Sequence, residues 1–181
     1  MPTTIMLIRH AEKPENPPPK GVDENGAEDK NALIVHGWER AGALVPFFRT
    51  PWVQGIRIPT VIYAAGISDQ PVMVDGDDIA KSLRAEQTVT PLAQALSLNV
   101  QNQYLVGQED LLVRSIEKET AVVLVAWEHK HIPLIAQKLS AVAPDKWPGK
   151  DVFDIVWVFE AGDGGYSFLS IAQELLAGDS G

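Results

Sequence analysis

Four short, unbroken runs of apolar and β-branched residues recur along the chain, and they constrain its fold more than any other feature. They occupy residues 3–8, 60–65, 121–127 and 153–159, and a weaker run at 100–106 is a candidate fifth. Runs without polar alternation are typical of strands covered on both faces, as in a parallel sheet. We therefore expect a mostly parallel sheet at the centre of the molecule.

Helical patterns fill the intervals between these runs. Residues 37–48 carry apolar side chains at a period of about 3.6 residues, and patterns of the same kind occur at 81–96, 109–119 and 133–142. Strands that alternate with helices predict an α/β fold, here a three-layer α/β/α sandwich. A chain of 181 residues is long enough for one such core, so we expect residues 1–181 to form a single domain.

Several segments depart from this alternation. Residues 14–32 are rich in Pro, Gly, Asn and acidic residues, which predicts a long flexible loop that could act as a specificity lid. Residues 67–78 form a second loop. The Gly-rich stretch 162–165 predicts a hairpin turn, and we expect the polar tail at 176–181 to fray.

Charge and composition exclude several classes of function. The chain has 24 acidic and 15 basic residues, a formal net charge of −9, and this balance disfavours a nucleic-acid partner. The absence of cysteine excludes disulfides, thiolate metal sites and cysteine nucleophiles. No apolar stretch approaches the length of about 18 residues that a membrane span needs, and no signal-peptide pattern is visible, so we expect a cytoplasmic protein without a membrane partner.

Histidines follow two of the predicted strands. Arg9 and His10 come directly after the first run, and His129 comes just after the run at 121–127. The carboxyl ends of parallel strands meet at one edge of a sheet, where α/β proteins bind their ligands. Arg84 stands near the start of a predicted helix, where backbone N–H groups also favour an anion. These four side chains predict a cationic pocket suited to a phosphoryl group.

Four ordered segments carry a resemblance to a known family. They read LIRHAE from Leu7, LIVHGWERAGAL from Leu33, SLRAEQTVTPLA from Ser82 and VLVAWEHKHI from Val123. Together they resemble the signature segments of the histidine phosphatase superfamily, which contains cofactor-dependent phosphoglycerate mutases, phosphohistidine phosphatases and small phosphomonoesterases. The resemblance implies a phosphoglycerate mutase-like fold over residues 3–135, although Val35 and His36 depart from the second segment.

The resemblance also implies roles for individual residues. His10 would be the nucleophile that transiently becomes a phosphohistidine. Arg9 and Arg84 would hold the phosphate oxygens, and His129 would donate a hydrogen bond to the phosphoryl group. These roles are chemically consistent, because neighbouring guanidinium groups keep an imidazole neutral and nucleophilic. A cationic cluster also stabilises phosphoryl transfer without a metal or other cofactor.

The activity that follows is a metal-independent phosphohydrolase acting on a small phosphomonoester or on phosphohistidine, including phosphohistidine in a protein. A non-catalytic phosphate-binding or signalling domain on the same fold is one alternative. A phosphoglycerate mutase-like phosphotransferase is another, but the mutases of this family are longer and carry extra segments that close over the substrate.

The second histidine has a rival in His131. His129 fits the family register better, because the family histidine directly follows the strand, although Lys130 replaces the usual small residue. We expect His131 at a helix start or at the pocket rim, and His36 at the surface. A metal site formed by Glu128, His129 and His131 is disfavoured by the cationic Lys130 and the nearby arginines.

The general acid is less clearly indicated. The larger family members place a Glu or Asp in the segment that follows the Arg-Ala-x-Gln-Thr helix, and here that segment contains Glu109 and Asp110. We take Glu109 as the candidate acid, although acidic residues in a first helical turn commonly act only as caps. Glu12 and Glu128 are closer to the histidines in sequence and could orient a ring or repel one type of phosphate.

Overall fold

A six-stranded sheet forms the centre of the protein, in a computed structural model that describes residues 1–14, 19–74, 76–140 and 142–179. The strand order is β5–β2–β6–β1–β7–β8. The strands are β1 Thr4–Arg9, β2 Val61–Ala64, β5 Val100–Gln101, β6 Val122–Trp127, β7 Ile155–Gly162 and β8 Gly165–Ala172. The first four in the order run parallel, and β7 and β8 run antiparallel to their neighbours. The predicted mostly parallel sheet is therefore confirmed.

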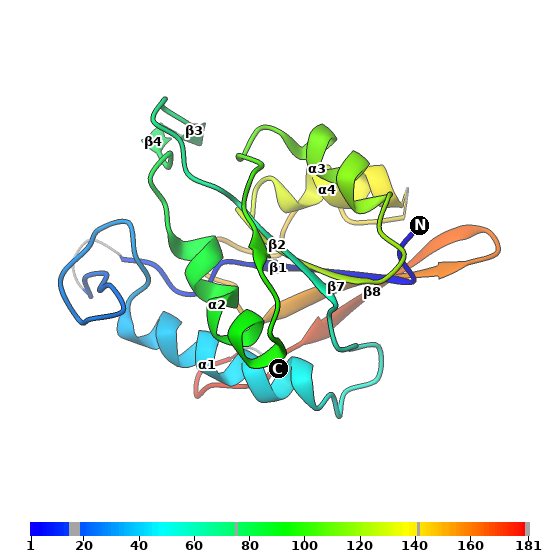
Figure 1. Ribbon diagram of the computed structural model, residues 1–181, viewed down its shortest axis with the longest axis horizontal. Helices are drawn as coiled ribbons and strands as arrows, with labels where there is room; N and C mark the ends of the chain where they lie inside the picture. Colours follow the sequence, from blue (N-terminus) through cyan, green and yellow to red (C-terminus); the bar gives the residue numbers. More distant parts are fainter. Residues whose placement is uncertain (15–18, 75, 141, 180–181) are drawn as a thin grey trace.

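Helices cover both faces of this sheet (Figure 1). They are α1 Val35–Arg49, α2 Arg84–Leu96, α3 Glu109–Ile116 and α4 Ile132–Leu139. Helices α1 and α2 pack together on one face, and α3 and α4 pack together on the other. Each predicted helix is present, and the three layers form the α/β/α sandwich that the alternating patterns predicted.

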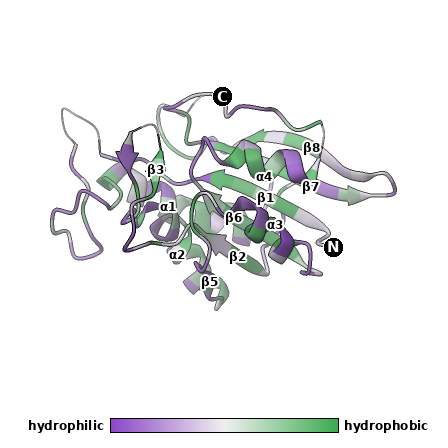
Figure 2. Cartoon of the chain, turned by 90° about the horizontal axis from the view of Figure 1, so that it is seen from above, coloured by the Kyte–Doolittle hydropathy of each residue, from purple (hydrophilic) through white to green (hydrophobic). Residues whose placement is uncertain are grey.

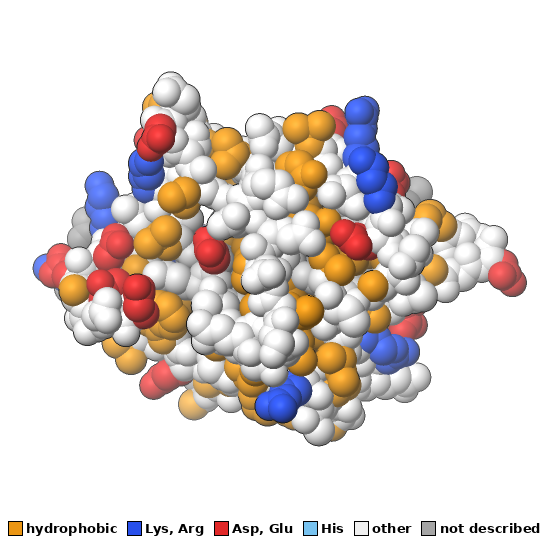
Figure 3. Space-filling model, in the orientation of Figure 1, with side chains coloured by type: hydrophobic (Ala, Val, Ile, Leu, Met, Phe, Trp, Pro, Cys, Tyr) orange, Lys and Arg blue, Asp and Glu red, His pale blue; other side chains and the backbone are white. Residues whose placement is uncertain are grey.

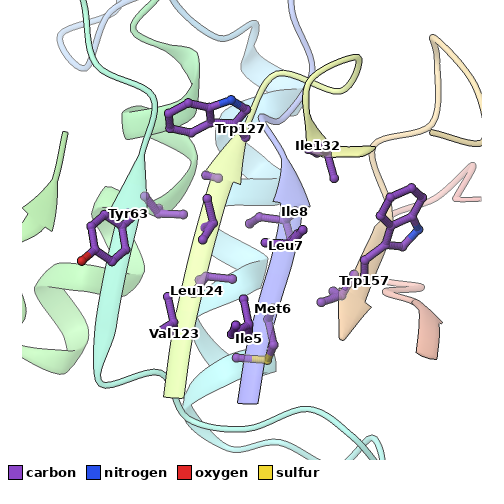
Figure 4. Packing of buried hydrophobic residues seen from close by; sticks show 14 of the residues in the cluster. Ile5, Met6, Leu7, Ile8, Tyr63, Val123, Leu124, Trp127, Ile132 and Trp157 are labelled. Carbon is purple, nitrogen blue, oxygen red and sulfur yellow. The ribbon is translucent and has the colours of Figure 1, made fainter. Parts of the chain in front are cut away.

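The core lies where β1 and β6 run side by side. All four residues from Ile5 to Ile8 are fully buried, and burial of each such side chain contributes about 1.5–3 kcal/mol. Figure 4 shows these side chains next to those of β6, with Trp127 at the end of that strand. Figure 2 shows the hydrophobic residues concentrated in the sheet. Apolar runs without alternation thus became strands covered on both faces.

The structure differs from the expected elements at the sheet edges. The run at 100–106 contributes only two residues to the sheet, as β5. Strand β8 was not predicted as a strand, because most of its residues are exposed or half-buried and it pairs only with β7. The predicted turn at 162–165 joins these two strands. The loop at 67–78 contains a small hairpin, β3 Met73–Val74 with β4 Asp77–Asp78.

The described part of the loop before α1 is held by local contacts. Val22 and Glu28 form an isolated antiparallel bridge, and Oδ1 of Asp23 accepts hydrogen bonds from two backbone N–H groups. The Trp38 indole of α1 donates to the Val22 carbonyl at 2.9 Å. Local hydrogen bonds therefore connect the described part of this loop to itself and to α1, and residues 15–18 lie outside the described residues.

The described part of the tail makes contacts with its own backbone and with α1. Asp179 accepts hydrogen bonds from the backbone of Leu175 and Leu176 and pairs with Arg40 of α1 at 2.6 Å. Residues 180–181 lie outside the described residues. In the part of the chain that the structure describes, no helix is long and apolar enough to cross a membrane.

Candidate active site

A cavity of about 510 Å³ opens at the carboxyl ends of β1, β2 and β6. Its lining includes all four side chains predicted to bind a phosphoryl group: Arg9, His10, Arg84 and His129. The strand register explains this convergence, because Arg9 lies opposite Trp127 and the His10 N–H donates to the Trp127 carbonyl at 3.1 Å. The two chain segments that carry the histidines therefore leave the sheet side by side.

His10 is held in a form suited to nucleophilic attack. Its Nδ1 lies 2.7 Å from the Ala11 carbonyl oxygen. A carbonyl only accepts, so Nδ1 carries the proton and Nε2 keeps its lone pair. Burial lowers the pKa of His10 well below its usual value, and the charge of Arg9 lowers it further. The ring is therefore neutral at physiological pH.

A hydroxyl of α2 fixes the backbone next to this histidine. The Ala11 N–H donates to Thr88 Oγ1 at 2.8 Å, and the Thr88 hydroxyl donates to the Arg84 carbonyl at 2.7 Å. Gln87 of the same helix accepts from the Leu33 N–H at 2.9 Å. The Arg-Ala-x-Gln-Thr pattern thus has a structural function as well, because it ties α2 to the segment that carries His10.

Arg9 is buried, and part of its guanidinium group has no hydrogen-bond partner among the described residues. Its Nη1 donates to the carbonyls of Lys150 and Val152, and its guanidinium carbon lies 3.9 Å from the centre of the Phe153 ring. Its Nε and Nη2 are buried and have no hydrogen-bond partner among the described residues. Burial lowers the pKa of Arg9 to about 10, which leaves it charged at neutral pH. Buried donors of this kind are normally satisfied, so they indicate an anion site.

Arg84 approaches the cavity from the first turn of α2. Its Nη2 donates to the Lys30 carbonyl at 2.8 Å, and its Nε is buried without a partner among the described residues. Burial lowers the pKa of Arg84. Leu83 precedes the helix and offers no side-chain cap, so the first backbone N–H groups of α2 also favour an anion.

His129 forms a close pair with its neighbour Glu128. The His129 Nδ1 lies 2.5 Å from Oε1 of Glu128, and the side chains of both residues are 11% exposed. The other carboxylate oxygen accepts from the Lys130 N–H at 2.7 Å. Burial alone would raise the pKa of Glu128, but the close contact with the His129 ring lowers it. Glu128 is therefore a carboxylate held against the His129 ring.

The structure does not bring Glu109 to this cavity. Oε1 of Glu109 accepts from the Gly107 N–H at 2.8 Å, from Trp127 Nε1 at 3.0 Å and from His131 Nδ1 at 2.9 Å. Burial would raise the pKa of Glu109, but these donors lower it, His131 first among them. An ionised carboxylate that accepts three hydrogen bonds on one oxygen is poorly placed to act as an acid.

The remaining sequence candidates also lie elsewhere. His131 occupies the N-cap position of α4, as expected of a residue at a helix start, and its hydrogen bond to Glu109 raises its pKa. Asp110 pairs with Lys138 of α4 at 2.5 Å. His36 lies on α1 with its Nδ1 2.9 Å from Glu39. Glu12 accepts from Arg40 rather than from a site histidine.

Other residues in the cavity were not identified from the sequence. Lys13 lines it, and burial together with Arg84 and Arg9 lowers the pKa of this lysine. Lys150 and Asp151 also line it, from the segment before β7, and Asp77 lines it from the small hairpin. Only Lys13 had a signal in the sequence, because it directly follows the segment that resembles the family signature.

The charge of the cavity differs from that of the whole molecule. Figure 3 shows acidic side chains gathered over the loop that precedes α1, in keeping with the net charge of −9. The cavity is lined by five cationic side chains: Arg9, Lys13, Arg84, Lys130 and Lys150. Three acidic side chains, Asp77, Glu128 and Asp151, line it as well. No cluster of His, Asp or Glu within the described ranges could hold a metal ion.

Solved structures with the same fold include phosphatases. The protein histidine phosphatase SixA, complexed with tungstate, is 14% identical with a TM-score of 0.57, and the match covers 94% of this chain and 97% of SixA. A phosphoserine phosphatase from Entamoeba histolytica in complex with 3-phosphoglyceric acid is 13% identical with a TM-score of 0.57, over 96% and 99% of the two chains. YhfR from Bacillus stearothermophilus is 14% identical with a TM-score of 0.56, over 98% of each chain.

These proteins are members of the histidine phosphatase superfamily, and the chain has their phosphoglycerate mutase-like fold. At this level of identity, the similarity establishes the fold alone. No protein-family model and no curated protein matches the sequence.

Proposed function

We propose that this protein is a phosphohydrolase of the histidine phosphatase superfamily that works through a phosphohistidine on His10. One observation carries the proposal. A buried, neutral imidazole with a free Nε2 shares a cavity with two arginines, and these arginines have buried N–H groups without partners among the described residues. A tetrahedral phosphoryl group would satisfy those donors while it faces the nucleophile.

The proposed reaction has two transfers. The Nε2 of His10 attacks phosphorus and the bond to the leaving oxygen breaks, which gives a phosphohistidine. Water then attacks phosphorus, the N–P bond breaks and inorganic phosphate leaves. Arg9 and Arg84 stabilise the phosphoryl oxygens in both transfers, and we propose that no metal is required because the cationic side chains supply this stabilisation.

The proposed substrate is a small phosphomonoester or a phosphohistidine. The cavity volume of about 510 Å³ leaves room for a leaving group besides the phosphate. The tungstate complex of SixA supports an oxyanion ligand for this fold, and SixA is described as a protein histidine phosphatase. The phosphoserine phosphatase supports a phosphomonoester equally well.

Turnover and trapping of the intermediate test this proposal. We expect hydrolysis of 4-nitrophenyl phosphate or of phosphohistidine between about pH 5 and 8, where an imidazole titrates. Rapid quenching with labelled substrate should give an acid-labile, base-stable phosphoenzyme. His10→Ala should lose both turnover and labelling, whereas His36→Ala, which changes a histidine outside the cavity, should retain both.

The same experiment distinguishes the alternatives. Phosphate binding without turnover of either substrate would refute the phosphohydrolase and favour a binding domain. Labelling of His10 followed by transfer to a second substrate, with no phosphate released to water, would favour a phosphotransferase.

A further inference from the structure

The cavity lacks the acid that the sequence suggested, so the proton for the leaving group must come from another residue. Three carboxylates line the cavity within the described residues, and Glu128 differs from the other two. Asp151 is paired with Lys150 at 3.8 Å at the exposed rim, and Asp77 is exposed on the small hairpin. Glu128 is buried and contacts His129 directly.

We infer that Glu128 is a positioning residue that makes His129 the proton donor and acceptor of the reaction. The inference rests on the proposed function, because it concerns the two transfers at His10. It assigns to a Glu–His pair the role that Glu109 was predicted to have. In this proposal, Glu128 acts on the reaction through the His129 ring.

The geometry supports this assignment in two ways. Nδ1 of His129 lies 2.5 Å from Oε1 of Glu128, but this nitrogen meets no hydrogen-bond geometry among the described residues, so the carboxylate acts on the ring as an ion-pair partner. The Nε2 of His129 is then the nitrogen left to exchange a proton in the cavity. The carboxylate is also fixed, because the Lys130 N–H donates to its other oxygen and the Glu128 carbonyl accepts from the N–H groups of His131 and Ile132.

The surrounding charges hold Glu128 ionised. His129 and then His131 lower the pKa of this carboxylate, and the charge of Glu128 in turn raises the pKa values of Arg9 and Lys13. In this proposal, the carboxylate 2.5 Å from Nδ1 offsets the positive charge that the His129 ring carries when Nε2 holds the proton it transfers. Desolvation of the pair strengthens this interaction, as in other carboxylate–imidazole pairs.

The proton balance closes over one cycle. In the first transfer, the N–P bond to His10 forms, the P–O bond to the leaving group breaks, and the leaving oxygen takes the Nε2 proton of His129. In the second transfer, water attacks phosphorus and the electron pair of the N–P bond returns to His10. The water proton passes to Nε2 of His129, so the imidazolium–carboxylate pair is restored without any other reactant.

Leaving-group dependence tests the inference. For a series of aryl phosphates, kcat/KM reports the first transfer, and the wild type should show a shallow dependence on leaving-group pKa because the oxygen is protonated as it departs. This measurement requires no variant. A steep wild-type dependence would overturn the inference.

Two variants then separate charge from orientation. Glu128→Gln keeps the size of the side chain beside the His129 ring but removes its charge, and Glu128→Ala removes both. With phenyl phosphate we expect losses in kcat/KM of roughly 10²-fold or more, within the range of general acid catalysis. With 2,4-dinitrophenyl phosphate, whose leaving group needs no proton, we expect losses of less than about tenfold. The larger loss should belong to Glu128→Ala.

The matched control is Glu39→Gln, which changes an exposed Glu that contacts His36 on α1, and its kcat/KM should not change for either substrate. Equal losses of Glu128→Gln for good and poor leaving groups would show a structural role, and no loss would show no role; either result overturns the inference. Failure of the proposed function is distinguishable, because it would appear as an inactive wild type or as an active His10→Ala.

Discussion

Arg40 joins the segment after β1 to the C-terminal tail, and its removal should destabilise the protein strongly. Its guanidinium donates to Glu12 Oε1 from Nε at 2.9 Å and from Nη2 at 2.6 Å. It also donates to both oxygens of Asp179, at 3.1 and 2.6 Å, and to Gln173 at 3.2 Å. The Arg40 side chain is only 3% exposed and that of Asp179 only 6%.

The expected magnitude follows from what Arg40→Met leaves behind. Methionine replaces most of the buried side-chain volume, but the carboxylates of Glu12 and Asp179 lose their cationic partner. Removing one member of a buried charge network costs about 3–5 kcal/mol. For a chain of this length, that corresponds to a fall in Tm of roughly 6–20 °C.

Urea denaturation followed by circular dichroism measures this change in the free energy of unfolding. The control is Arg57→Met, which removes an exposed pair with Glu160 at 2.8 Å whose side chains are 48% and 42% exposed. Exposed pairs contribute about 0–1 kcal/mol, so the control should remain close to the wild type. A loss below about 1 kcal/mol for Arg40→Met would refute the reasoning, because the tail would then not depend on this network.

Three further predictions concern the site and its surroundings. Arg84→Met should lower kcat/KM by roughly 10²-fold or more and weaken inhibition by tungstate, measured with 4-nitrophenyl phosphate, because it removes a charged donor to the phosphoryl group. The pKa of His10 is lowered in the folded state, so unfolding takes up a proton below the ordinary histidine pKa of about 6.5. The contribution of His10 to stability is therefore complete above that pH and is lost as the pH falls. Urea titrations at several pH values should show a smaller pH dependence for His10→Gln than for the wild type. Glu109→Gln should lower the free energy of unfolding by about 3 kcal/mol by breaking its pair with His131, yet the folded enzyme should keep the leaving-group dependence of the wild type; a steeper dependence would restore Glu109 as the acid.

Much of the fold could be predicted because strands that are buried on both faces have uninterrupted apolar sequences. The runs that became β1 and β6 are apolar without interruption, since both faces of the central strands are covered. The edges could not be predicted in the same way. Strand β8 is half-exposed and alternates weakly, and the two residues of β5 are too short to form a pattern.

The contacts of the tail could not be predicted for a related reason. Its sequence is polar and Gly-containing, which is typical of a frayed end. Its order depends on one carboxylate, Asp179, that meets a buried arginine 139 positions earlier in the chain. A contact over such a distance leaves no local signal in either segment.

In the site, the positions of the histidines at the strand ends could be predicted, but their side-chain partners could not. The convergence of His10 and His129 could be predicted, because both follow parallel strands whose carboxyl ends meet at one edge of the sheet. The side-chain partners of His129 and His131, which both follow β6, could not be predicted. Residues 128–131 form a turn rather than a strand, so His129 and His131 do not share a face as alternate residues of a strand would.

Each of these histidines meets a different glutamate as a result. His131 occupies the N-cap position of α4 and contacts Glu109, which also accepts from Trp127 Nε1, and neither His131 nor Glu109 lines the cavity. His129 contacts Glu128 at the cavity wall. Both pairs consist of a buried carboxylate and an imidazole, so the residue types alone do not show which pair can take part in the reaction. Access to the cavity distinguishes the two pairs, because only a histidine that reaches the phosphoryl group can exchange a proton with the leaving oxygen.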